Sequence, residues 1–367
     1  MIRVLNVMHS LTLGGLETTV MNYYRNINRS KVQFDFLITS EHRDYYEDEA
    51  ISLGARVFRR PWRTRKPIQN AVKLALVLTN NPEIKIVHMH SSNSIAAIDA
   101  FVAALCQISV RVVHSHSELA KFQPPLQRLH RPLLRIIATH WVGCSDQAGL
   151  ALFGERAWSS SNKTMLCYNA RDLKVYRYDS ERRRVKREEL GIESNFALIH
   201  VARLDVSKNQ GFLLEAFSHV MKSDPSIVLL MAGDGELRSI LENQSSALGL
   251  DDCVRFLGQR DDIADLLQAS DVFVLPSLYE GLPGAAIEAQ AVGLPCLLSD
   301  KVSLETMITD EVEFLPITNG PNIWAERILS LREYERRNSQ QKMRTAGYDI
   351  LQEAKKLEEF YLQAAGR

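Results

Sequence analysis

Short apolar runs alternate with amphipathic stretches along the first half of the chain. The apolar runs are rich in Val, Ile and Leu and predict strands at 2–8, 32–39, 84–89, 110–114 and 140–144. The stretches between them have helical periodicity, for example at 16–27, 67–79, 94–106 and 145–153. Strands that alternate with helices in this way predict a mostly parallel sheet with helices on both faces.

The same alternation begins again after residue 190. Its apolar runs are FALIHVAR (196–203), SIVLLMAG (226–233), CVRFLG (253–258), DVFVLPS (271–277) and PCLLSD (295–300). The polar segment 171–189 separates the two series, and we interpret it as a linker that runs into a helix. We therefore predict an α/β protein with two doubly wound, Rossmann-like domains that face each other across a cleft. In such sheets, ligands bind beyond the carboxyl ends of the strands.

Length and composition agree with this picture. A chain of 367 residues is too long for one ordinary core, and 46% hydrophobic with 24% charged residues is typical of a globular protein. No apolar run reaches the length of a membrane span, and the first ten residues predict a strand rather than a signal peptide. The five cysteines are scattered without a CxxC motif, which predicts free thiols in a reducing compartment. We expect a cytoplasmic protein.

Charge is spread unevenly, although the total is zero. Residues 1–170 carry 20 Lys and Arg against 12 Asp and Glu, a net +8, and residues 171–367 carry 24 against 32, a net −8. A basic half suits an anionic acceptor or a membrane surface. The segments FRRPWRTRKP (58–67) and QRLHRPLLR (127–135) fit either contact with anionic lipid headgroups or plain solvated loops.

Two glutamates stand in the segment SLYEGLPGAAIEAQAVGLP (277–295), with seven residues between them. If a helix begins near Gly284, its free backbone N–H groups form an anion site. Glu280 then lies at the mouth of this site, and Glu288 lies about one turn into the helix. Two carboxylates beside a phosphate site suit a nucleotide sugar. Alternatively, Glu280 is solvated and Glu288 is favoured by the helix dipole.

Cations follow the first strand of the second half in VARLDVSKNQG. Arg203 and Lys208 are placed to hold a diphosphate and to neutralise charge on a leaving group. They could equally be two surface cations. We favour the functional interpretation because Arg203 directly follows an apolar strand, where burial without a partner would be costly.

Glycines and histidines follow the first-half strands. Gly14 and Gly15 would let the backbone approach a phosphate at a helix N-terminus, although a tight turn would also use them, and no GxGxxG motif is present. In RVVHSHSE, His114 and His116 share one face of a strand and could bind a sugar hydroxyl or a developing charge. VHMHSS repeats the pattern, and each of these histidines could instead be structural. We disfavour a metal site because the sequence shows no further ligands near either pair.

Two further loops could line the ligand site. AGDGEL (232–237) predicts a strand-to-helix turn, and the backbone amides of 258–262 could read a base edge.

Taken together, the residues resemble a known family, the retaining glycosyltransferases of the GT-B fold in family 4, which includes bacterial capsular and exopolysaccharide transferases. The resemblance covers essentially the whole chain. The motifs that carry it, in order, are LGGLETTVMNYYRNI, VVHSHSE, VGCSDQAGLALFG, YNARDLKVY, VARLDVSKNQ, AGDGEL, FLGQRDDI and DVFVLPSLYEGLPGAAIEAQAVGLP. The most specific is the last, with its two glutamates.

The resemblance implies a domain organisation. Residues 1–170 would form the acceptor-side domain, 171–189 the linker and 190–345 the domain that binds the nucleotide sugar. Residues 346–367 would form a helix that crosses back to the first domain. Two positions depart from the family pattern. Ala202 stands where a glycine commonly precedes the arginine, and Arg171 stands where an apolar residue is usual, so the hinge is expected to differ.

The resemblance also implies roles for residues of the second domain. Glu288 would bind the ribose, and Arg203 and Lys208 would hold the diphosphate. Glu280 would contact the donor sugar and the diphosphate, together with the backbone of Gly284 and Ala285.

In the first domain, Gly14 and Gly15 would approach the diphosphate. His116 would lie near the sugar and the acceptor, with His114 in its place if the strand register differs. No metal and no cofactor are expected, because cations and helix dipoles neutralise the diphosphate.

The predicted function is that of a retaining glycosyltransferase in bacterial surface polysaccharide biosynthesis. The donor would be a nucleoside diphosphate sugar, with uridine the expected base, and the acceptor a hydroxyl of a glycan or a lipid-linked glycan. Peripheral contact with the inner face of the membrane is left open, and no nucleic-acid partner is expected. The alternatives are a nucleotide-sugar 2-epimerase, a non-catalytic nucleotide-sugar-binding subunit and a Rossmann oxidoreductase.

Overall fold

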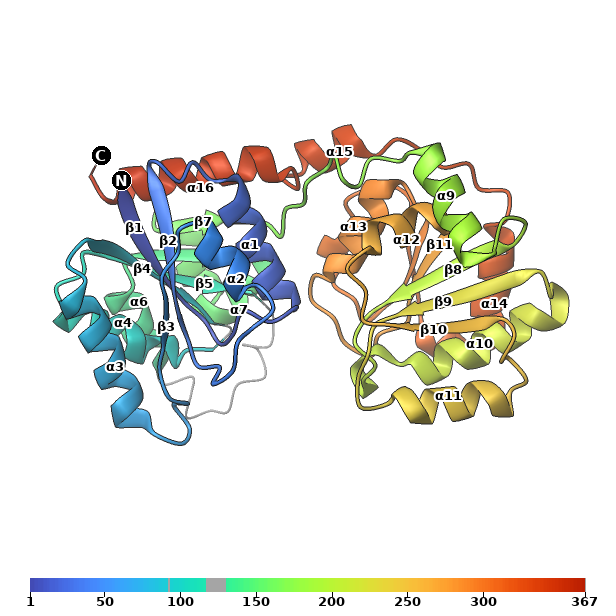
Figure 1. Cartoon of the computed structure of the whole chain (residues 1–367), viewed down its shortest axis with the longest axis horizontal. Helices are drawn as coiled ribbons and strands as arrows, with labels where there is room; N and C mark the ends of the chain where they lie inside the picture. Colours follow the sequence, from blue (N-terminus) through green and yellow to red (C-terminus); the bar gives the residue numbers. More distant parts are fainter. Residues whose placement is uncertain (92, 117–129, 367) are drawn as a thin grey trace. The chain divides into compact units, whose positions relative to one another are not determined.

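A computed structural model describes residues 1–91, 93–116 and 130–366 of the chain. The chain divides into two compact units (Figure 1). Unit 1 comprises Met1–Asp172 and Gly347–Arg367, and unit 2 comprises Leu173–Ala346. Each unit is an α/β layered fold with its own parallel sheet, so the predicted fold class of two Rossmann-like domains is confirmed.

Unit 1 contains a seven-stranded sheet in the order β3-β2-β1-β4-β5-β6-β7, in which all neighbours are parallel. The strands are β1 (Ile2–Val7), β2 (Val32–Ile38), β3 (Val57–Arg59), β4 (Ile84–His90), β5 (Val110–Ser115), β6 (His140–Gly143) and β7 (Thr164–Leu166). Apolar side chains cover both faces of this sheet, which explains why its strands read as nearly continuous apolar runs.

Helices pack on both faces of the unit 1 sheet. One face is covered by α1 (Gly15–Asn26), α2 (Glu47–Ser52) and α16 (Ile350–Ala364). The other is covered by α3 (Pro67–Asn80), α4 (Ala96–Leu105), α6 (His130–Ile137), α7 (Asp146–Phe153) and α8 (Glu155–Ser160). The segment 127–135 therefore enters α6, although its residues 127–129 lie outside the described residues.

The C-terminal helix α16 belongs to unit 1 although it follows unit 2 in the sequence. It packs along α1, and its Glu358 carboxylate accepts hydrogen bonds from the Lys31 side chain (2.9 Å) and the Asn28 backbone N–H (3.1 Å). Just before it, Asp349 pairs with Arg171 in an isolated parallel bridge. The buried Arg171 guanidinium donates to the Asn169 carbonyl (3.0 Å), so a charged residue fits this position through backbone acceptors.

Unit 2 contains a six-stranded parallel sheet in the order β10-β9-β8-β11-β12-β13. The strands are β8 (Phe196–Val201), β9 (Ile227–Ala232), β10 (Val254–Gly258), β11 (Val272–Leu275), β12 (Cys296–Ser299) and β13 (Val312–Leu315). The α-helices are α9 (Ser180–Leu190), α10 (Gln210–Ser223), α11 (Arg238–Ala247), α12 (Ile263–Ala269), α13 (Gly284–Val292), α14 (Gly320–Ser330) and α15 (Gln340–Thr345). Short 3₁₀ turns lie at η2 (Val206–Lys208), η3 (Leu304–Thr306) and η4 (Ile317–Asn319).

The helices of unit 2 also form two layers. Helices α10, α11 and α14 pack on one face of the sheet, and helices α12 and α13 pack on the other. Half of the segment interpreted as a linker, 171–189, lies in α9, which packs on α12 through an Arg182–Asp265 ion pair of 2.7 Å. The chain therefore enters unit 2 before the first strand of its sheet.

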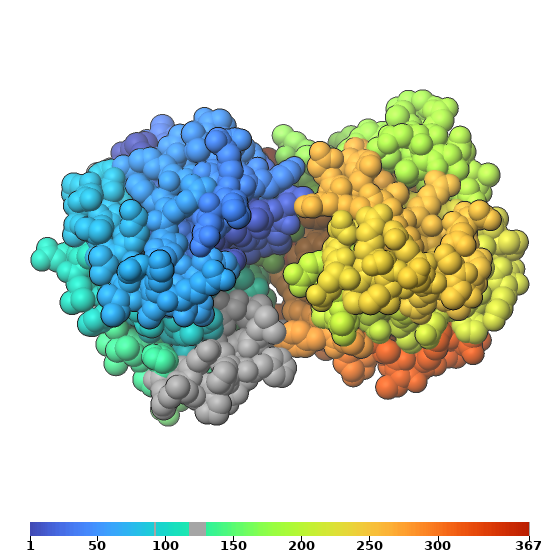
Figure 2. Space-filling model, turned by 60° about the horizontal axis from the view of Figure 1, so that its bottom comes forward, coloured from blue at the N-terminus to red at the C-terminus, as the bar shows by residue number. Residues whose placement is uncertain are grey.

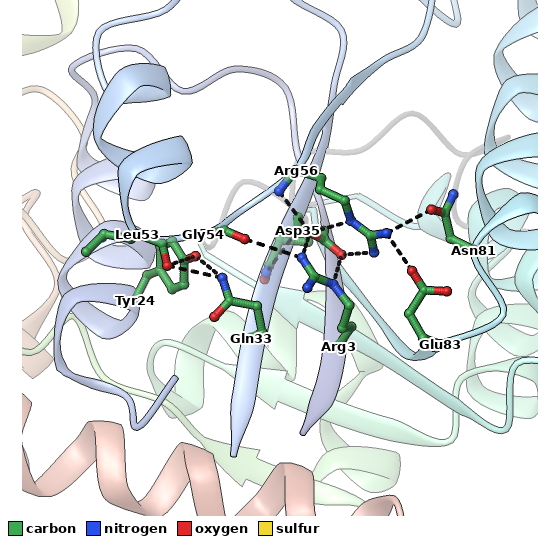
Figure 3. Close-up of polar contacts among 10 residues, drawn as sticks. Arg3, Tyr24, Gln33, Asp35, Leu53, Gly54, Arg56, Asn81 and Glu83 are labelled. Atoms are coloured by element: carbon green, nitrogen blue, oxygen red, sulfur yellow. Dashed lines mark hydrogen bonds and ion pairs between the residues drawn. The ribbon is translucent and has the colours of Figure 1, made fainter. Parts of the chain in front are cut away.

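A buried carboxylate ties the edge of the unit 1 sheet together (Figure 3). Asp35 on β2 is fully buried and pairs with Arg3 on β1 at 2.5 Å and with Arg56, just before β3, at 2.6 Å. Burial raises the pKa of Asp35, but the hydrogen bonds from Arg3 and Arg56 outweigh it, and the pKa lies below its ordinary value. Two arginines of the basic half thus have a structural role.

The basic segment 58–67 is likewise partly internal. Arg60 and Arg63 both bind the buried Asp99 carboxylate of α4, with Arg60 at 2.8 Å, and Arg59 pairs with Glu47 at 2.5 Å. Three of its five cations therefore form ion pairs within unit 1. The alternative of a plain solvated loop does not describe this segment. None of the helices in the described ranges combines the length and hydropathy that crossing a membrane requires. All five cysteines are free thiols, as predicted.

Candidate functional site

Helix α13 begins at Gly284, where the sequence predicted a helix N-terminus. Pro283 precedes it, and the Pro283 carbonyl accepts the N–H groups of Ala286 (3.1 Å) and Ile287 (3.3 Å). Within the part of unit 2 that the structure describes, the N–H groups of Gly284 and Ala285 make no hydrogen bond. Two unused donors at a helix N-terminus, with the positive end of the helix dipole behind them, can bind an anion.

Lys208 and Glu280 form an ion pair, and Glu280 precedes the first residue of this helix by four positions in the sequence. Both side chains are about four-fifths buried, with 19% and 21% exposed. A backbone hydrogen bond from Leu278 N–H to the Ser207 carbonyl (2.8 Å) joins the same two loops. The loop after β8 and the loop after β11 therefore bring together a cation and a carboxylate that the sequence assigned to one ligand. Glu288 lies half-buried in the second turn of α13.

Arg203 differs from the sequence expectation. We expected it to be buried at the end of an apolar strand, but β8 ends at Val201 and the Arg203 side chain is 77% exposed. Its Nε donates to Asp205 (2.8 Å), whose carboxylate also accepts the Ser207 backbone N–H (2.9 Å). Burial raises the pKa of Asp205, yet these hydrogen bonds outweigh it and hold the pKa below its ordinary value. Arg203 is thus a solvent-facing cation at the carboxyl edge, aligned by Asp205.

The glycines of AGDGEL allow two loops of unit 2 to pack closely. Gly233 has a φ of +136°, and a Cβ there would lie 1.9 Å from the Ala202 carbonyl oxygen. A Cβ on Gly235 would lie 2.3 Å from the Leu204 carbonyl oxygen. These glycines are therefore required by the contact between the loops after β8 and β9. For the 258–262 loop, an Arg260–Asp262 ion pair of 2.6 Å is present, and its role in reading a base stays a prediction.

In unit 1, Gly14 is the N-cap of α1 and Gly15 is its first residue. A Cβ on Gly14 would lie 2.4 Å from the Glu17 carboxylate, which is buried and accepts a hydrogen bond from Ser10 Oγ (3.0 Å). A Cβ on Gly15 would meet nothing within 4 Å. The first glycine is explained by internal packing, and the second leaves the backbone open to a ligand.

The two histidine pairs meet at the carboxyl edge of the unit 1 sheet. His90 on β4 lies opposite His114 on β5 in the strand register. The ring centroids of His88 and His90 are 4.4 Å apart, and those of His114 and His116 are 3.8 Å apart. The sequence predicted each pair of histidines but not the contact between the two pairs. It also did not predict the contact with Tyr361 of α16, whose hydroxyl lies 2.5 Å from His88 Nδ1.

All four imidazoles are held in the neutral form. Burial lowers the pKa of His90 to about 3. Burial, and in second place the neighbouring histidines, lower the pKa values of His88, His114 and His116 well below their ordinary value. At neutral pH these rings therefore each carry one N–H donor and one acceptor nitrogen.

The histidine cluster has some of the features of a metal site. Ring nitrogens of His88, His90 and His114 all lie within 4.8 Å of one another, so the premise that no further ligands lie near each pair was wrong. However, both His90 nitrogens are engaged, Nε2 with Asn6 Oδ1 (3.0 Å) and Nδ1 with His116 Nε2 (2.9 Å). A metal would have to displace one of these bonds. The observed arrangement is a hydrogen-bonded chain.

Two Rossmann-like domains, each with polar groups gathered beyond its carboxyl strand ends, define the class of protein, which has the GT-B fold. Residues 182–350 match the family of glycosyl transferases group 1. EpsF of Bacillus subtilis (strain 168), assigned as a glycosyltransferase, is 35% identical over an alignment of 346 residues that covers 89% of this chain and 86% of that protein. The chain belongs to the group 1 glycosyltransferases.

A second relative and a solved structure extend the comparison over the whole chain. The relative is the UDP-Gal:alpha-D-GlcNAc-diphosphoundecaprenol alpha-1,3-galactosyltransferase of Escherichia coli, which is 26% identical over 98% of this chain and 97% of that protein. The crystal structure of HepE from Anabaena, in complex with UDP and glucose, aligns with a TM-score of 0.80 over 98% of this chain and 99% of that chain. Its sequence identity is 19%, so this likeness concerns the fold.

Proposed function

We propose that this glycosyltransferase moves a sugar from a UDP-sugar to a hydroxyl of a glycan or lipid-linked acceptor in bacterial surface polysaccharide biosynthesis, with retention of the anomeric configuration. The observation that carries the proposal is the Lys208–Glu280 ion pair, in a loop that leads into the unused N–H groups at the start of α13. The E. coli relative is named for a UDP-sugar donor and a lipid diphosphate-linked acceptor, and HepE was solved with UDP and glucose. Both names support the choice of donor.

The proposed chemistry depends on charge stabilisation. The bond between the anomeric carbon and the diphosphate oxygen breaks, and the acceptor oxygen bonds to the same carbon while its proton passes to the departing phosphate. Lys208 and the N–H groups of Gly284 and Ala285 would stabilise the negative diphosphate, and Arg203 would add charge from the solvent side. Glu280 and Glu288 would accept hydrogen bonds from sugar and ribose hydroxyls. These cations and dipoles would take the place of a metal ion.

In unit 1 we propose that Gly15 offers an open backbone approach and that Gly14 shapes the turn before α1. His116 is assigned to the sugar and acceptor hydroxyls. His114, which is buried with both ring nitrogens unbonded within the described residues, is assigned to supporting that ring rather than to ligand contact.

Product analysis tests the proposed function. The protein is incubated with UDP-sugars and a polyprenyl diphosphate-linked sugar acceptor in the presence of EDTA. Transfer of an α-configured sugar from an α-configured donor supports the proposal. An epimerised UDP-sugar would instead identify an epimerase, and binding of UDP without turnover of any donor would identify a non-catalytic subunit. Loss of transfer on chelation would contradict the metal-free mechanism.

We also propose peripheral contact with an anionic membrane through the outer faces of α3, α4 and α6, which lie side by side on unit 1 (Figure 1). The exposed apolar side chains of these helices are Ile68, Val72, Leu76, Ile98, Phe101, Leu105, Leu133 and Ile136. The only carboxylate in the three helices is Asp99, which is buried in its ion pairs with Arg60 and Arg63.

Cations border this apolar surface. Lys66 and Lys73 are exposed on α3 or at its start, and Figure 2 shows this part of the chain, in blue, at the outer surface of unit 1. An apolar surface that has basic neighbours, on helices that carry no exposed acid, favours the interface of an anionic bilayer. Flotation with vesicles that contain an anionic phospholipid, compared with vesicles of a zwitterionic lipid, tests this contact.

A further inference from the structure

Four residues of unit 1 form a continuous chain of hydrogen bonds across the carboxyl edge of its sheet. Asn6 on β1 donates its Nδ2 to the Asp35 backbone carbonyl on β2 (3.4 Å). Its Oδ1 lies 3.0 Å from His90 Nε2 on β4, and His90 Nδ1 lies 2.9 Å from His116 Nε2, just after β5. The chain begins at a backbone carbonyl, which can only accept, and this fixes the direction of every bond that follows.

The Asn6 amide is the first group whose donor and acceptor atoms can be assigned. Its NH₂ group is used by the Asp35 carbonyl, so its oxygen faces His90. An amide oxygen is only an acceptor, and therefore His90 Nε2 must carry the hydrogen. Because burial keeps His90 neutral, with a pKa lowered to about 3, its Nδ1 has no hydrogen and is an acceptor.

The second step transfers this direction to His116. Since His90 Nδ1 is an acceptor, His116 Nε2 must donate to it. Burial lowers the pKa of His116 well below its ordinary value, so the ring is neutral and its one hydrogen is already on Nε2. Its Nδ1 is then a bare acceptor, and among the described residues the one hydrogen bond of this ring is that of Nε2 to His90.

We propose that Asn6 and His90 are positioning residues that hold His116 in the Nε2–H tautomer, so that its Nδ1 accepts a hydrogen bond from a hydroxyl of the substrate. This inference rests on the proposed function and narrows it. A ring nitrogen that only accepts binds a sugar hydroxyl and repels a phosphate oxygen. His116 therefore recognises a hydroxyl of the donor or acceptor sugar and does not stabilise the anionic leaving group.

Nitrogen NMR of the ¹⁵N-histidine-labelled full chain at neutral pH tests the tautomer directly, because protonated and bare imidazole nitrogens have well-separated shifts. We expect His116 with a protonated Nε2 and a bare Nδ1 in the wild-type protein, without ligand. A His116 ring protonated on Nδ1 would overturn the proposal. This measurement does not depend on catalysis, so it separates failure of the tautomer from failure of the proposed function.

Two matched substitutions test the chain itself. His90→Gln offers a donor to Asn6 and an acceptor to His116, and should keep the His116 tautomer, whereas His90→Leu offers neither and should give a mixture. Asn6→Leu should give a mixture as well. An unchanged His116 tautomer in His90→Leu and Asn6→Leu would overturn the positioning role. His42→Gln, at an exposed histidine, is the control and should change nothing.

Kinetics with deoxy-sugar donors identify the hydroxyl. His90→Leu should lower kcat/KM about 10-fold for the natural donor and leave it unchanged for the one deoxy analogue that lacks the bonded hydroxyl. If His90→Leu lowers kcat/KM equally for every deoxy donor and for every deoxy acceptor, the proposal that His116 recognises a hydroxyl is overturned. Addition of Zn²⁺ provides the last control. Stoichiometric binding that shifts the His90 and His116 nitrogens would show that the cluster is a metal site and would also overturn the proposal.

Discussion

Lys208 and Glu280, which are 72 residues apart in the chain, form an ion pair that links the loop after β8 to the loop after β11. Glu280 precedes the first residue of α13 by four positions, and the ion pair orients one side chain that can hold a phosphate and one that can hold a hydroxyl. A diphosphate that takes Lys208 would release Glu280 to bind a sugar. Each of the two side chains therefore has an opposite charge within the protein.

The first prediction concerns Lys208. Lys208→Met should lower kcat for sugar transfer by roughly 10²- to 10³-fold, because a positioned charge at the leaving group is lost. Steady-state release of UDP from a saturating donor measures this. Lys222→Met, at an exposed lysine at the end of α10, is the matched control and should retain full activity. If Lys208→Met turns over donor as fast as wild type does, the Lys208–Glu280 ion pair no longer supports the proposed function.

Arg203 allows a separate prediction, because it is so exposed. Arg203→Ala should change the free energy of unfolding of the unliganded protein by no more than about 0.5 kcal/mol, as expected for a surface position. A ligand at 100 times its Kd stabilises the folded protein by about 2.7 kcal/mol. Because loss of Arg203 should weaken UDP binding, the variant should lose most of the rise in Tm that UDP produces in the wild-type protein. Differential scanning fluorimetry with and without UDP measures both. An undiminished UDP shift would show that Arg203 is a surface cation.

Elements of the fold were predictable where the physical signal was long enough. β1 and β9 have six residues each, and their apolar side chains are buried on both faces, so both appear as apolar runs. β3 and β7 have only three residues and lie at the sheet edges, where such a short segment shows no periodicity, and the sequence did not reveal them. β13 was missed in the same way, because it is a four-residue edge strand with only one buried residue.

The candidate site was predictable to the level of residue type, and its binding of a ligand stays a prediction. Lys208 and Glu280 were expected at a ligand because a cation and a carboxylate follow strand ends, and they were found together. Tertiary partners carry no such local signal. Asn6 is 84 residues from His90, and Tyr361 is 273 residues from His88, so only the fold reveals these contacts. Arg203 shows the opposite error, in which proximity to a strand was taken for burial.

Asp35 supports a prediction of stability and its pH dependence. Asp35→Asn should lower the free energy of unfolding by about 3–5 kcal/mol at pH 7, because Arg3 and Arg56 lose a buried counter-ion. The folded-state pKa of Asp35 is depressed, so its contribution is fully present above the unfolded pKa of about 3.9 and is lost as pH falls through the lower folded pKa. The difference between wild type and variant should therefore shrink below about pH 4.

Urea unfolding at pH 7 and at pH 3 measures the Asp35 effect. Asp48→Asn is the matched control, since Asp48 forms an exposed ion pair with Arg43 and should cost at most about 0.5 kcal/mol. An Asp35→Asn effect that is the same at both pH values would show that packing, rather than charge, stabilises this position.

Gly233 gives a prediction for the loop contact in unit 2. Gly233→Ala should lower the free energy of unfolding by at least about 2–3 kcal/mol, because its backbone has a φ of +136° and the added Cβ would lie 1.9 Å from the Ala202 carbonyl oxygen. Gly249→Ala is the matched control. It also has a positive φ, +70°, but its Cβ would meet nothing within 4 Å, so it should cost only about 1–2 kcal/mol. Chemical denaturation compares the two, and equal losses would show that backbone strain alone explains the Gly233 effect.

The last prediction concerns the apolar surface of α3, α4 and α6. A triple variant, Ile68→Ser, Phe101→Ser and Ile136→Ser, should lose most of the binding to anionic vesicles, because it removes one exposed apolar side chain from each helix. Its Tm should stay within a few degrees of wild type, since these side chains are 78%, 48% and 77% exposed.

The control variant for this surface carries Ile240→Ser and Leu304→Ser, two exposed apolar side chains of unit 2 at 61% and 73% exposure. It should bind vesicles as wild type does. High salt should weaken the wild-type interaction, because Lys66 and Lys73 contribute about 1 kcal/mol each near an anionic surface. Equal binding of both variants, or binding that is the same for anionic and zwitterionic vesicles, would show that the exposed apolar side chains of unit 1 do not form a membrane surface.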